Sequence, residues 1–190
     1  MPFTGQAWRV FPCDRQAPPG QPFSPTYISP TQGSGRFDIT DTGVTYLAET
    51  PEHAVAEKIQ RFRGQTIEDH DLTEFGRPLA LVECQASTEV IRGIADLCDW
   101  NTLAKHALGP YVVASRALAK TQAIAKMLYD AGYVGLRWWS ALSGDWHSVV
   151  LFLARLSADG LRYMKPQILT LDHPAVREAA SAIGVGVESP

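Results

Sequence analysis

Three polar side chains of complementary type stand at short intervals in the first third of the sequence. Arg36 ends the segment Gly33-Ser34-Gly35-Arg36, Tyr46 follows ten residues later, and Glu57 follows Tyr46 by eleven residues. An arginine can hold a diphosphate or a carboxylate through its planar set of N–H donors. A tyrosine offers a flat surface on which a base or another ring can stack. A glutamate whose side chain borders a cleft places a negative charge beside the ligand.

The glycines before Arg36 favour a ligand-binding loop. Gly33 and Gly35 lack a Cβ atom, so the backbone can approach a ligand closely and present its N–H groups to an anion. A plain surface loop is the alternative for this segment. A dinucleotide-binding fingerprint is disfavoured, because the third glycine and the preceding strand of that motif are missing.

Tyr46 and Glu57 also have simpler interpretations. Residues 43–48 alternate as in a strand, and a strand tyrosine is commonly a core aromatic. Glu57 lies on a predicted helix, nearly opposite the apolar stripe of Val55, Ile59 and Phe62. On that face a glutamate can be solvated and paired with Arg61 at i+4.

A second polar segment lies between two apolar runs late in the chain. It reads Arg137-Trp138-Trp139-Ser140 and continues through Ser143, Asp145, Trp146, His147 and Ser148. Tryptophans mixed with small polar groups favour the wall of a hydrated pocket. A Ser-His-Asp hydrolase site is disfavoured, because Ser140 lacks the GxSxG context.

The elements that must position these residues follow from periodicity and capping. Thr50 and Pro51 are typical of an N-cap and a first helical residue. The Pro/Gly/Ser-rich stretch 18–35 cannot be helical and is predicted to be a lid or a binding loop. Strands are expected over 8–11, 43–48, 79–84, 134–138, 149–154 and 167–171, and helices over 50–64, 99–107, 115–131 and 174–183. The pattern predicts one α+β domain over 1–190, a mixed sheet flanked by helices.

Composition excludes several classes of protein. The 190 residues are 45% hydrophobic and 19% charged, as expected for a folded domain. Basic residues number 17 and acidic residues 20, without a basic cluster, which argues against nucleic-acid binding. Three cysteines without a CxxC pair argue against a disulfide framework and a zinc site. The longest strongly apolar run, 149–154, is too short to span a bilayer, so a cytoplasmic protein is expected.

Taken together, these motifs resemble the RES domain, the toxin half of RES–Xre toxin–antitoxin pairs. The matching segments run from about 8 to 155, leaving 156–190 as a C-terminal extension. The sequence departs from the family where Asp38-Ile39 replaces Asn-Pro and where Ala141 replaces an arginine after Ser140. The matching segments are Trp8-Arg9-Val10, Gly35-Arg36-Phe37, Gly43–Ala48, Ala54–Glu57, Ser140 and Leu151-Phe152.

The resemblance implies a fold like that of ADP-ribosyltransferases and NAD⁺ as the substrate, with no metal. It assigns Arg36, with Gly35 beside it, to the diphosphate and Tyr46 to nicotinamide stacking. Glu57 is assigned to the ribose and Ser140 to the ribose or carboxamide. The acceptor of ADP-ribose stays open between a host protein, which is favoured, and water or phosphate. The implied partner is a helix-turn-helix antitoxin of the Xre family in a hetero-oligomer; a non-catalytic interaction module is the alternative.

Overall fold

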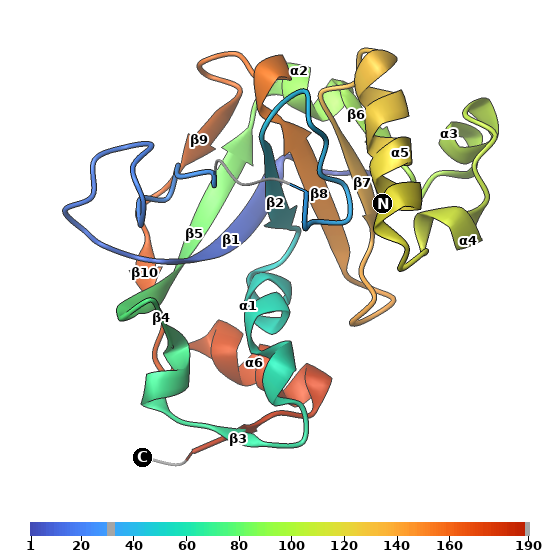
Figure 1. Ribbon diagram of the computed structural model, residues 1–190. Coiled ribbons are helices and arrows are strands. Elements are labelled where there is room, and N and C mark those ends of the chain that lie inside the picture. Colours follow the sequence, from blue (N-terminus) through green and yellow to red (C-terminus); the bar gives the residue numbers. More distant parts are fainter. Residues whose placement is uncertain (30–32, 189–190) are drawn as a thin grey trace.

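The computed structural model describes residues 1–29 and 33–188, and these residues form a nine-stranded mixed sheet surrounded by helices (Figure 1). The strand order is β10-β5-β1-β2-β8-β7-β6, and β4 and β9 also pair with β5. The strands of this sheet are β1 (Gln6–Pro12), β2 (Val44–Ala48), β4 (Thr73–Glu74), β5 (Arg77–Ala86), β6 (Ile94–Asp96), β7 (Gly135–Trp139), β8 (His147–Phe152), β9 (Leu161–Tyr163) and β10 (Gln167–Ile168).

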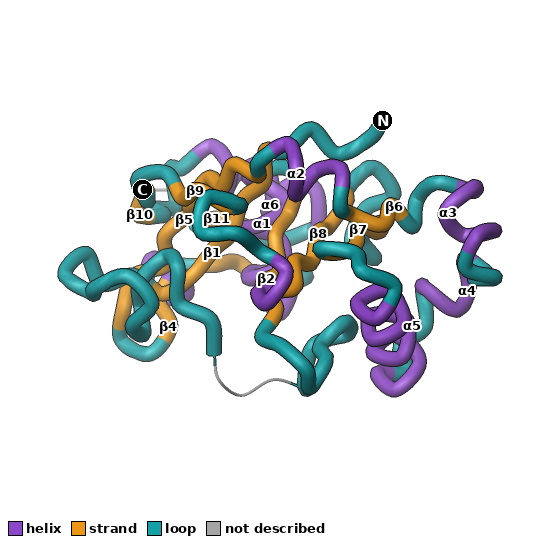
Figure 2. Tube along the Cα trace, turned by 90° about the horizontal axis from the view of Figure 1, so that it is seen from above, coloured by secondary structure: helices purple, strands orange, loops and turns teal. Residues whose placement is uncertain are grey.

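The helices gather in separate groups around this sheet. Helices α3, α4 and α5 lie beside β6 and β7 (Figures 1 and 2), and α1 and α6 lie together below the sheet in the view of Figure 1. A small parallel pair, β3 (Thr66–Ile67) with β11 (Gly186–Val187), lies near the second group. The helices are α1 (Pro51–Ile59), α2 (Thr88–Arg92), α3 (Trp100–Lys105), α4 (Pro110–Val113), α5 (Leu118–Asp130) and α6 (Pro174–Ile183); the 3₁₀ turns are η1 (Gln60–Phe62), η2 (Asp69–Leu72) and η3 (Leu153–Arg155).

This architecture confirms the expected α+β domain with a mixed sheet. Strands β6 and β7 run parallel, whereas the other pairings in the nine-stranded sheet are antiparallel. The apolar strands β7 and β8 occupy interior positions, as their composition predicted. No helix of the described residues is long and apolar enough to cross a membrane.

The sheet divides between β1 and β2. These two strands share a single residue pair, Trp8 with Ala48, whereas β1 pairs with β5 along its whole length and β2 pairs with β8 along its whole length. The sheet therefore consists of two well-paired halves that separate beyond one point of contact.

Different helices cover the two halves on one face of the sheet. Helix α5 packs Ile124, Ala125 and Leu128 against β7 and β8 in one apolar cluster. Helices α1 and α6 pack against each other and against residues of β1 and β5 in another. Between these groups β2 has a single exposed residue, Tyr46, while its other four residues are buried.

Helix α1 begins as the sequence predicted. The side chain of Thr50 caps it by accepting a hydrogen bond from the His53 N–H, and Pro51 occupies the first turn. The regular helix ends at Ile59, earlier than the expected end near Gly64, because the last turn tightens into η1. Gly64, at φ +76°, makes the turn that follows.

Other element boundaries differ from expectation in ways that have local causes. Asp99 lies outside α3 as its N-cap, because its carboxylate accepts the N–H of Thr102. Helix α5 begins three residues late, and the strand expected over 167–171 contains only β10. Strand β10 pairs with β5 at only two positions, Leu81 and Ala80.

The segment 156–188 is part of the same fold as the rest of the chain. Strands β9 and β10 pair with β5, and α6 packs on α1. Within the Pro-rich stretch 18–35, the described residues form no helix or strand, and residues 30–32 lie outside the described part of the chain.

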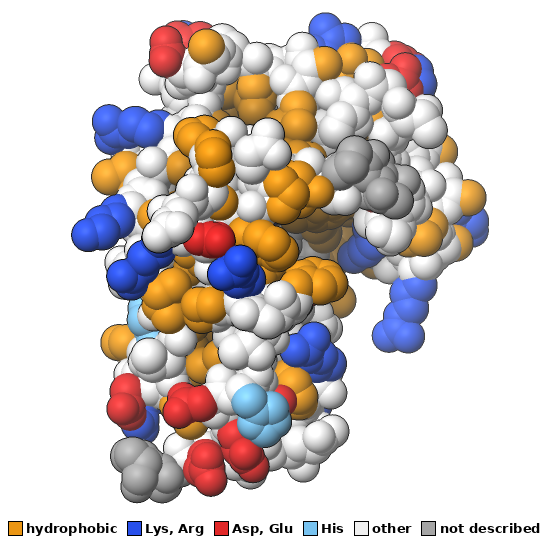
Figure 3. All heavy atoms as spheres, turned by 60° about the vertical axis from the view of Figure 1, so that its left-hand side comes forward, with side chains coloured by type: hydrophobic (Ala, Val, Ile, Leu, Met, Phe, Trp, Pro, Cys, Tyr) orange, Lys and Arg blue, Asp and Glu red, His pale blue; other side chains and the backbone are white. Residues whose placement is uncertain are grey.

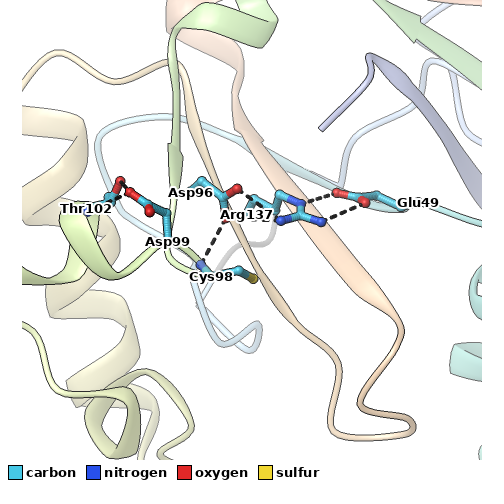
Figure 4. A network of polar contacts seen from close by, with 6 residues as sticks. All are labelled: Glu49, Asp96, Cys98, Asp99, Thr102 and Arg137. Atoms are coloured by element: carbon cyan, nitrogen blue, oxygen red, sulfur yellow. Dashed lines mark hydrogen bonds and ion pairs between the residues drawn. The ribbon is translucent and has the colours of Figure 1, made fainter. Parts of the chain in front are cut away.

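A buried ion-pair network links β2 with β6, the two outer strands of the half-sheet β2-β8-β7-β6. Arg137 of β7 donates a pair of hydrogen bonds to Glu49, the residue after β2, and also contacts Asp96 at the end of β6 (Figure 4). The Arg137 side chain is 3% exposed. Burial lowers the pKa of Arg137, but its hydrogen bonds and charge interactions with Glu49 and Asp96 outweigh this, so the pKa lies above its ordinary value.

Candidate active site

A cleft of about 750 Å³ opens where β1 and β2 separate. A space-filling view shows a hollow in the surface with hydrophobic side chains inside it and Lys and Arg side chains near it (Figure 3). Strands β1 and β2, helix α1, the end of β7 and two loops line the cleft. The structure brings all five sequence-predicted site residues to this cleft: Gly35, Arg36, Tyr46, Glu57 and Ser140.

Tyr46 is the exposed residue of β2 and lines the cleft. Its hydroxyl donates to Asp38 Oδ1 at 2.8 Å and accepts from the Phe37 N–H at 3.0 Å. Its ring meets Trp138 of β7 edge-on, with ring centroids 6.3 Å apart. Burial and the bond to Asp38 raise the pKa of Tyr46, so the phenol is neutral and acts as a fixed ring rather than as an acid.

Asp38 organises the glycine loop, and this corrects one sequence-based expectation. The N–H groups of Gly33 and Gly35 donate to Asp38 Oδ2 at 2.7 and 2.8 Å. The glycine-rich sequence predicted that these two N–H groups would face a ligand anion. They are instead bound to Asp38. Position 35 is a glycine for another reason, because a Cβ there would lie 2.3 Å from the Tyr46 hydroxyl. On the other side of the loop, Gln122 of α5 donates to the carbonyls of Gly33 and Gly35.

Arg36 is half-buried, and one nitrogen of its guanidinium is hydrogen-bonded to the protein backbone. Its Nη2 donates to the Val113 carbonyl at 2.6 Å, at the end of α4, and to the Ser115 carbonyl at 3.4 Å. Burial lowers the pKa of Arg36, while its interactions with Tyr46 and Glu57 oppose the shift. The guanidinium is thus fixed in direction, and its charge acts on both Tyr46 and Glu57.

Glu57 lies on the open side of α1, with a side chain that is 47% exposed. It does not pair with Arg61 among the described contacts; Arg61 packs over the ring of Phe62 instead. The Oε2 atom of Glu57 accepts from Gln60 Nε2 at 3.0 Å, and Oε1 lies 3.3 Å from Nε2 of His53. These two contacts fix the carboxylate at the cleft, which is the condition that a functional glutamate required.

Ser140 is buried where β7 ends. Its N–H donates to the Trp146 carbonyl at 2.7 Å, and its Oγ accepts from the Leu142 N–H at 3.1 Å. The hydroxyl proton of Ser140 remains available to the cleft. The expected wall of three tryptophans is wrong in part, because only Trp138 of these three lines the cleft, while Trp146 stacks on His53 and Trp139 packs on the α5 cluster.

Nε of Arg36 is a buried polar atom with no hydrogen-bond partner among the described residues, and Arg36 lines this cleft. Buried polar groups in folded proteins are nearly always paired, so an unpaired group needs a specific explanation. A polar ligand in the cleft is such an explanation, and the cleft has the size range of small-molecule sites.

The family model of the RES domain matches residues 6–172. The chain belongs to the RES domain family. Its fold is similar to that of a chain in the crystal structure of the M. tuberculosis MbcT–MbcA toxin–antitoxin complex, with a TM-score of 0.56 at 15% sequence identity. The match covers 87% of this RES domain and 84% of the other chain. No curated protein is significantly similar to it in sequence.

Sequence reasoning missed several residues of this RES domain's cleft. Arg9 lies on β1, donates to the Pro25 carbonyl at 3.1 Å, and has its pKa lowered by burial. Lys58 of α1 pairs with Glu74 at 2.7 Å and also lines the cleft. Asp38 was noted only as a departure from the family pattern. The alternation of Trp8 and Val10 around Arg9 was the one signal that a charged residue sits within an otherwise apolar strand.

Proposed function

We propose that this RES domain is a toxin that consumes NAD⁺ by cleaving its nicotinamide–ribose bond and transferring ADP-ribose to a protein. The main support is the cleft itself, in which a partly buried arginine with an unpaired Nε, a fixed tyrosine ring and a half-exposed carboxylate occur together. These are the groups that an anionic dinucleotide with a cationic ring needs. Membership of the RES family supports the same substrate.

Cleavage of the nicotinamide–ribose bond does not need a general acid. The pyridinium nitrogen takes the bonding electron pair when the C–N bond breaks, so nicotinamide leaves as a neutral molecule without a proton. Positive charge then develops on the ribose, as in glycoside hydrolysis. The carboxylate of Glu57 stabilises that charge, and it accepts the proton when an acceptor hydroxyl attacks the ribose carbon.

The other residues orient the substrate. Arg36 would hold the diphosphate, because its guanidinium is fixed in direction and keeps an unpaired Nε. Tyr46 would stack against nicotinamide, since its hydroxyl is tied at both the donor and acceptor sides. Ser140 would donate its free hydroxyl proton to the ribose or carboxamide. Such positioning contributes a large part of the rate in group-transfer reactions.

The decisive test of cleavage is nicotinamide release by Glu57→Gln. We expect this variant to bind NAD⁺ and to remain folded while release stops. Glu178→Gln, an exposed glutamate on α6, is the matched control and should turn over normally. Arg36→Ala should raise KM more than it lowers kcat. Normal turnover by Glu57→Gln would remove Glu57 from the reaction.

The acceptor is identified with NAD⁺ labelled in its adenylate half. Label on a protein band supports the proposed transferase, label in free ADP-ribose indicates a hydrolase, and label in a phosphorylated ADP-ribose indicates a phosphorylase. The absence of nicotinamide release in every condition, including added cell extract, would instead favour a non-catalytic interaction module.

A toxin of this kind needs a neutralising partner in the cell that makes it. The solved relative comes from a toxin–antitoxin complex, which supports an antitoxin for this RES domain as well. We propose a helix-turn-helix protein of the Xre family that covers the cleft in a hetero-oligomer in the cytoplasm. Co-expression with the product of a neighbouring helix-turn-helix gene should restore growth and block nicotinamide release.

A further inference from the structure

His53 lies directly behind Glu57, one turn earlier on α1, and is fully buried. Its Nδ1 is 3.1 Å from the backbone carbonyl of His147 on β8, and its Nε2 is 3.3 Å from Glu57 Oε1. Its ring lies flat against Trp146, with centroids 5.1 Å apart and an interplanar angle of 17°. The imidazole is thus held at both nitrogens and on one face.

The partners of His53 determine where its protons are. A carbonyl oxygen only accepts hydrogen bonds, so Nδ1 must be the protonated nitrogen of a neutral ring. A neutral ring then presents a bare lone pair on Nε2, and an ionised carboxylate also only accepts. The contact between Nε2 and Oε1 therefore requires a second proton. Nε2 of the ring and Oε1 of the carboxylate share this proton across 3.3 Å.

We propose that His53 is the positioning residue of Glu57 and holds its carboxylate at the cleft as one partner of an imidazolium–carboxylate pair. The proposal rests on the proposed role of Glu57 in NAD⁺ cleavage. The pair fixes Oε1 from the protein side, while Gln60 fixes Oε2. A carboxylate held at both oxygens keeps one orientation when positive charge develops on the ribose, and errors in such orientation are costly.

The neighbouring charged groups are compatible with this pair. On β8, the side chain of His147 has its pKa lowered by burial and by the positive charge of Arg137, so it adds little positive charge near His53 at neutral pH. On the loop before α1, the N–H of Glu49 donates to the same His147 carbonyl that His53 contacts, and the Glu49 side chain is paired with Arg137. Among the described contacts, Glu57 is the carboxylate that meets the His53 ring.

The pair can be observed without any assay of activity. Nitrogen-15 NMR of the histidine rings at pH 7 should show His53 with protons on both nitrogens in the wild type. In Glu57→Gln it should show a proton on Nδ1 alone, because an amide can donate to a bare Nε2. A bare Nε2 in the wild type, or a His53 signal that Glu57→Gln does not change, would overturn the pairing.

Kinetics then test whether the pair matters to the reaction. His53→Phe keeps the flat contact with Trp146 and removes the donor, so we expect kcat to fall by about 10- to 100-fold with KM nearly unchanged. His53→Gln keeps an N–H near the position of Nε2 and should recover most of the lost kcat. His70→Gln, at an exposed histidine of η2, is the control.

The two proposals fail in different ways. A wild type that releases no nicotinamide would refute the proposed function, while the NMR result would still decide the pairing. An active wild type in which His53→Phe keeps full kcat would refute the positioning role alone. A rise in KM together with the fall in kcat, or no recovery in His53→Gln, would make His53 a structural residue and would also overturn the role.

Discussion

The hydroxyl of Tyr46 donates a 2.8 Å hydrogen bond to the carboxylate of Asp38. The second oxygen of the same carboxylate accepts the N–H groups of Gly33 and Gly35. Asp38 is 6% exposed, so one buried carboxylate ties the central strand β2 to the loop that bears Arg36. The positions of the proposed ring-binding and diphosphate-binding side chains are therefore set by the same group.

Tyr46→Phe should weaken this link without removing the ring. The substitution takes one donor from a buried carboxylate and leaves the Phe37 N–H without its acceptor, so the free energy of unfolding should fall by about 1–2 kcal/mol. Chemical denaturation measures the change. Tyr111→Phe is the control, because that side chain is 81% exposed and its hydroxyl is in water. Equal stability of Tyr46→Phe and Tyr111→Phe would show that the link contributes nothing.

Gly35→Ala tests the close approach of the loop to β2. The added Cβ would lie 2.3 Å from the Tyr46 hydroxyl and 2.4 Å from Asp38 Oδ1, so the loop or the strand residue must move. We expect a loss of about 1–3 kcal/mol in the free energy of unfolding, together with weaker NAD⁺ binding. Gly144→Ala is the matched control, since a Cβ there has nothing within 4 Å. Wild-type NAD⁺ affinity in Gly35→Ala would contradict the proposed place of this loop.

The local signals in the sequence were sufficient for α1 and for the face on which Glu57 lies. Thr50, Pro51 and the apolar stripe of Val55 and Ile59 act within a few residues of one another, and the structure has them as expected. His53 gave no such signal. Its partners, the His147 carbonyl and Trp146, lie more than ninety residues later in the chain, and only the pairing of β2 with β8 brings them together.

The cleft itself depends on long-range pairing in the same way. Strand β1 was expected from its composition, but nothing local to it shows that it meets β2 only at Trp8 and Ala48. The two-residue strands β3, β4, β10 and β11 have too few residues for a periodic pattern. The role of Asp38 was likewise hidden, because its three donors come from a loop and a neighbouring strand.

Arg137→Met should be strongly destabilising although it lies outside the cleft. The buried guanidinium pairs with Glu49 and Asp96, whose side chains are 18% and 26% exposed, and its removal leaves both carboxylates close together without a cation. We expect the free energy of unfolding to fall by about 2–4 kcal/mol, a value reduced for the partial exposure of the two acids. Arg92→Met, at an exposed arginine at the end of α2, should change stability little. Equal melting temperatures for the two variants would mean that hydration of Glu49 and Asp96 fully offsets the loss of the guanidinium.

The same network gives a prediction about pH. Burial and the positive charge of Arg137 lower the pKa of His147 below its ordinary value of 6.5. Below that value the unfolded chain binds a proton that the folded protein resists, so this residue makes stability fall as pH falls from 7 toward 5. His147→Gln removes the titrating group, so its melting temperature should fall less steeply over this range than that of the wild type. The His147 backbone carbonyl that contacts His53 is retained in this variant. Parallel slopes for the two proteins would show that His147 is protonated equally well in the folded and unfolded states.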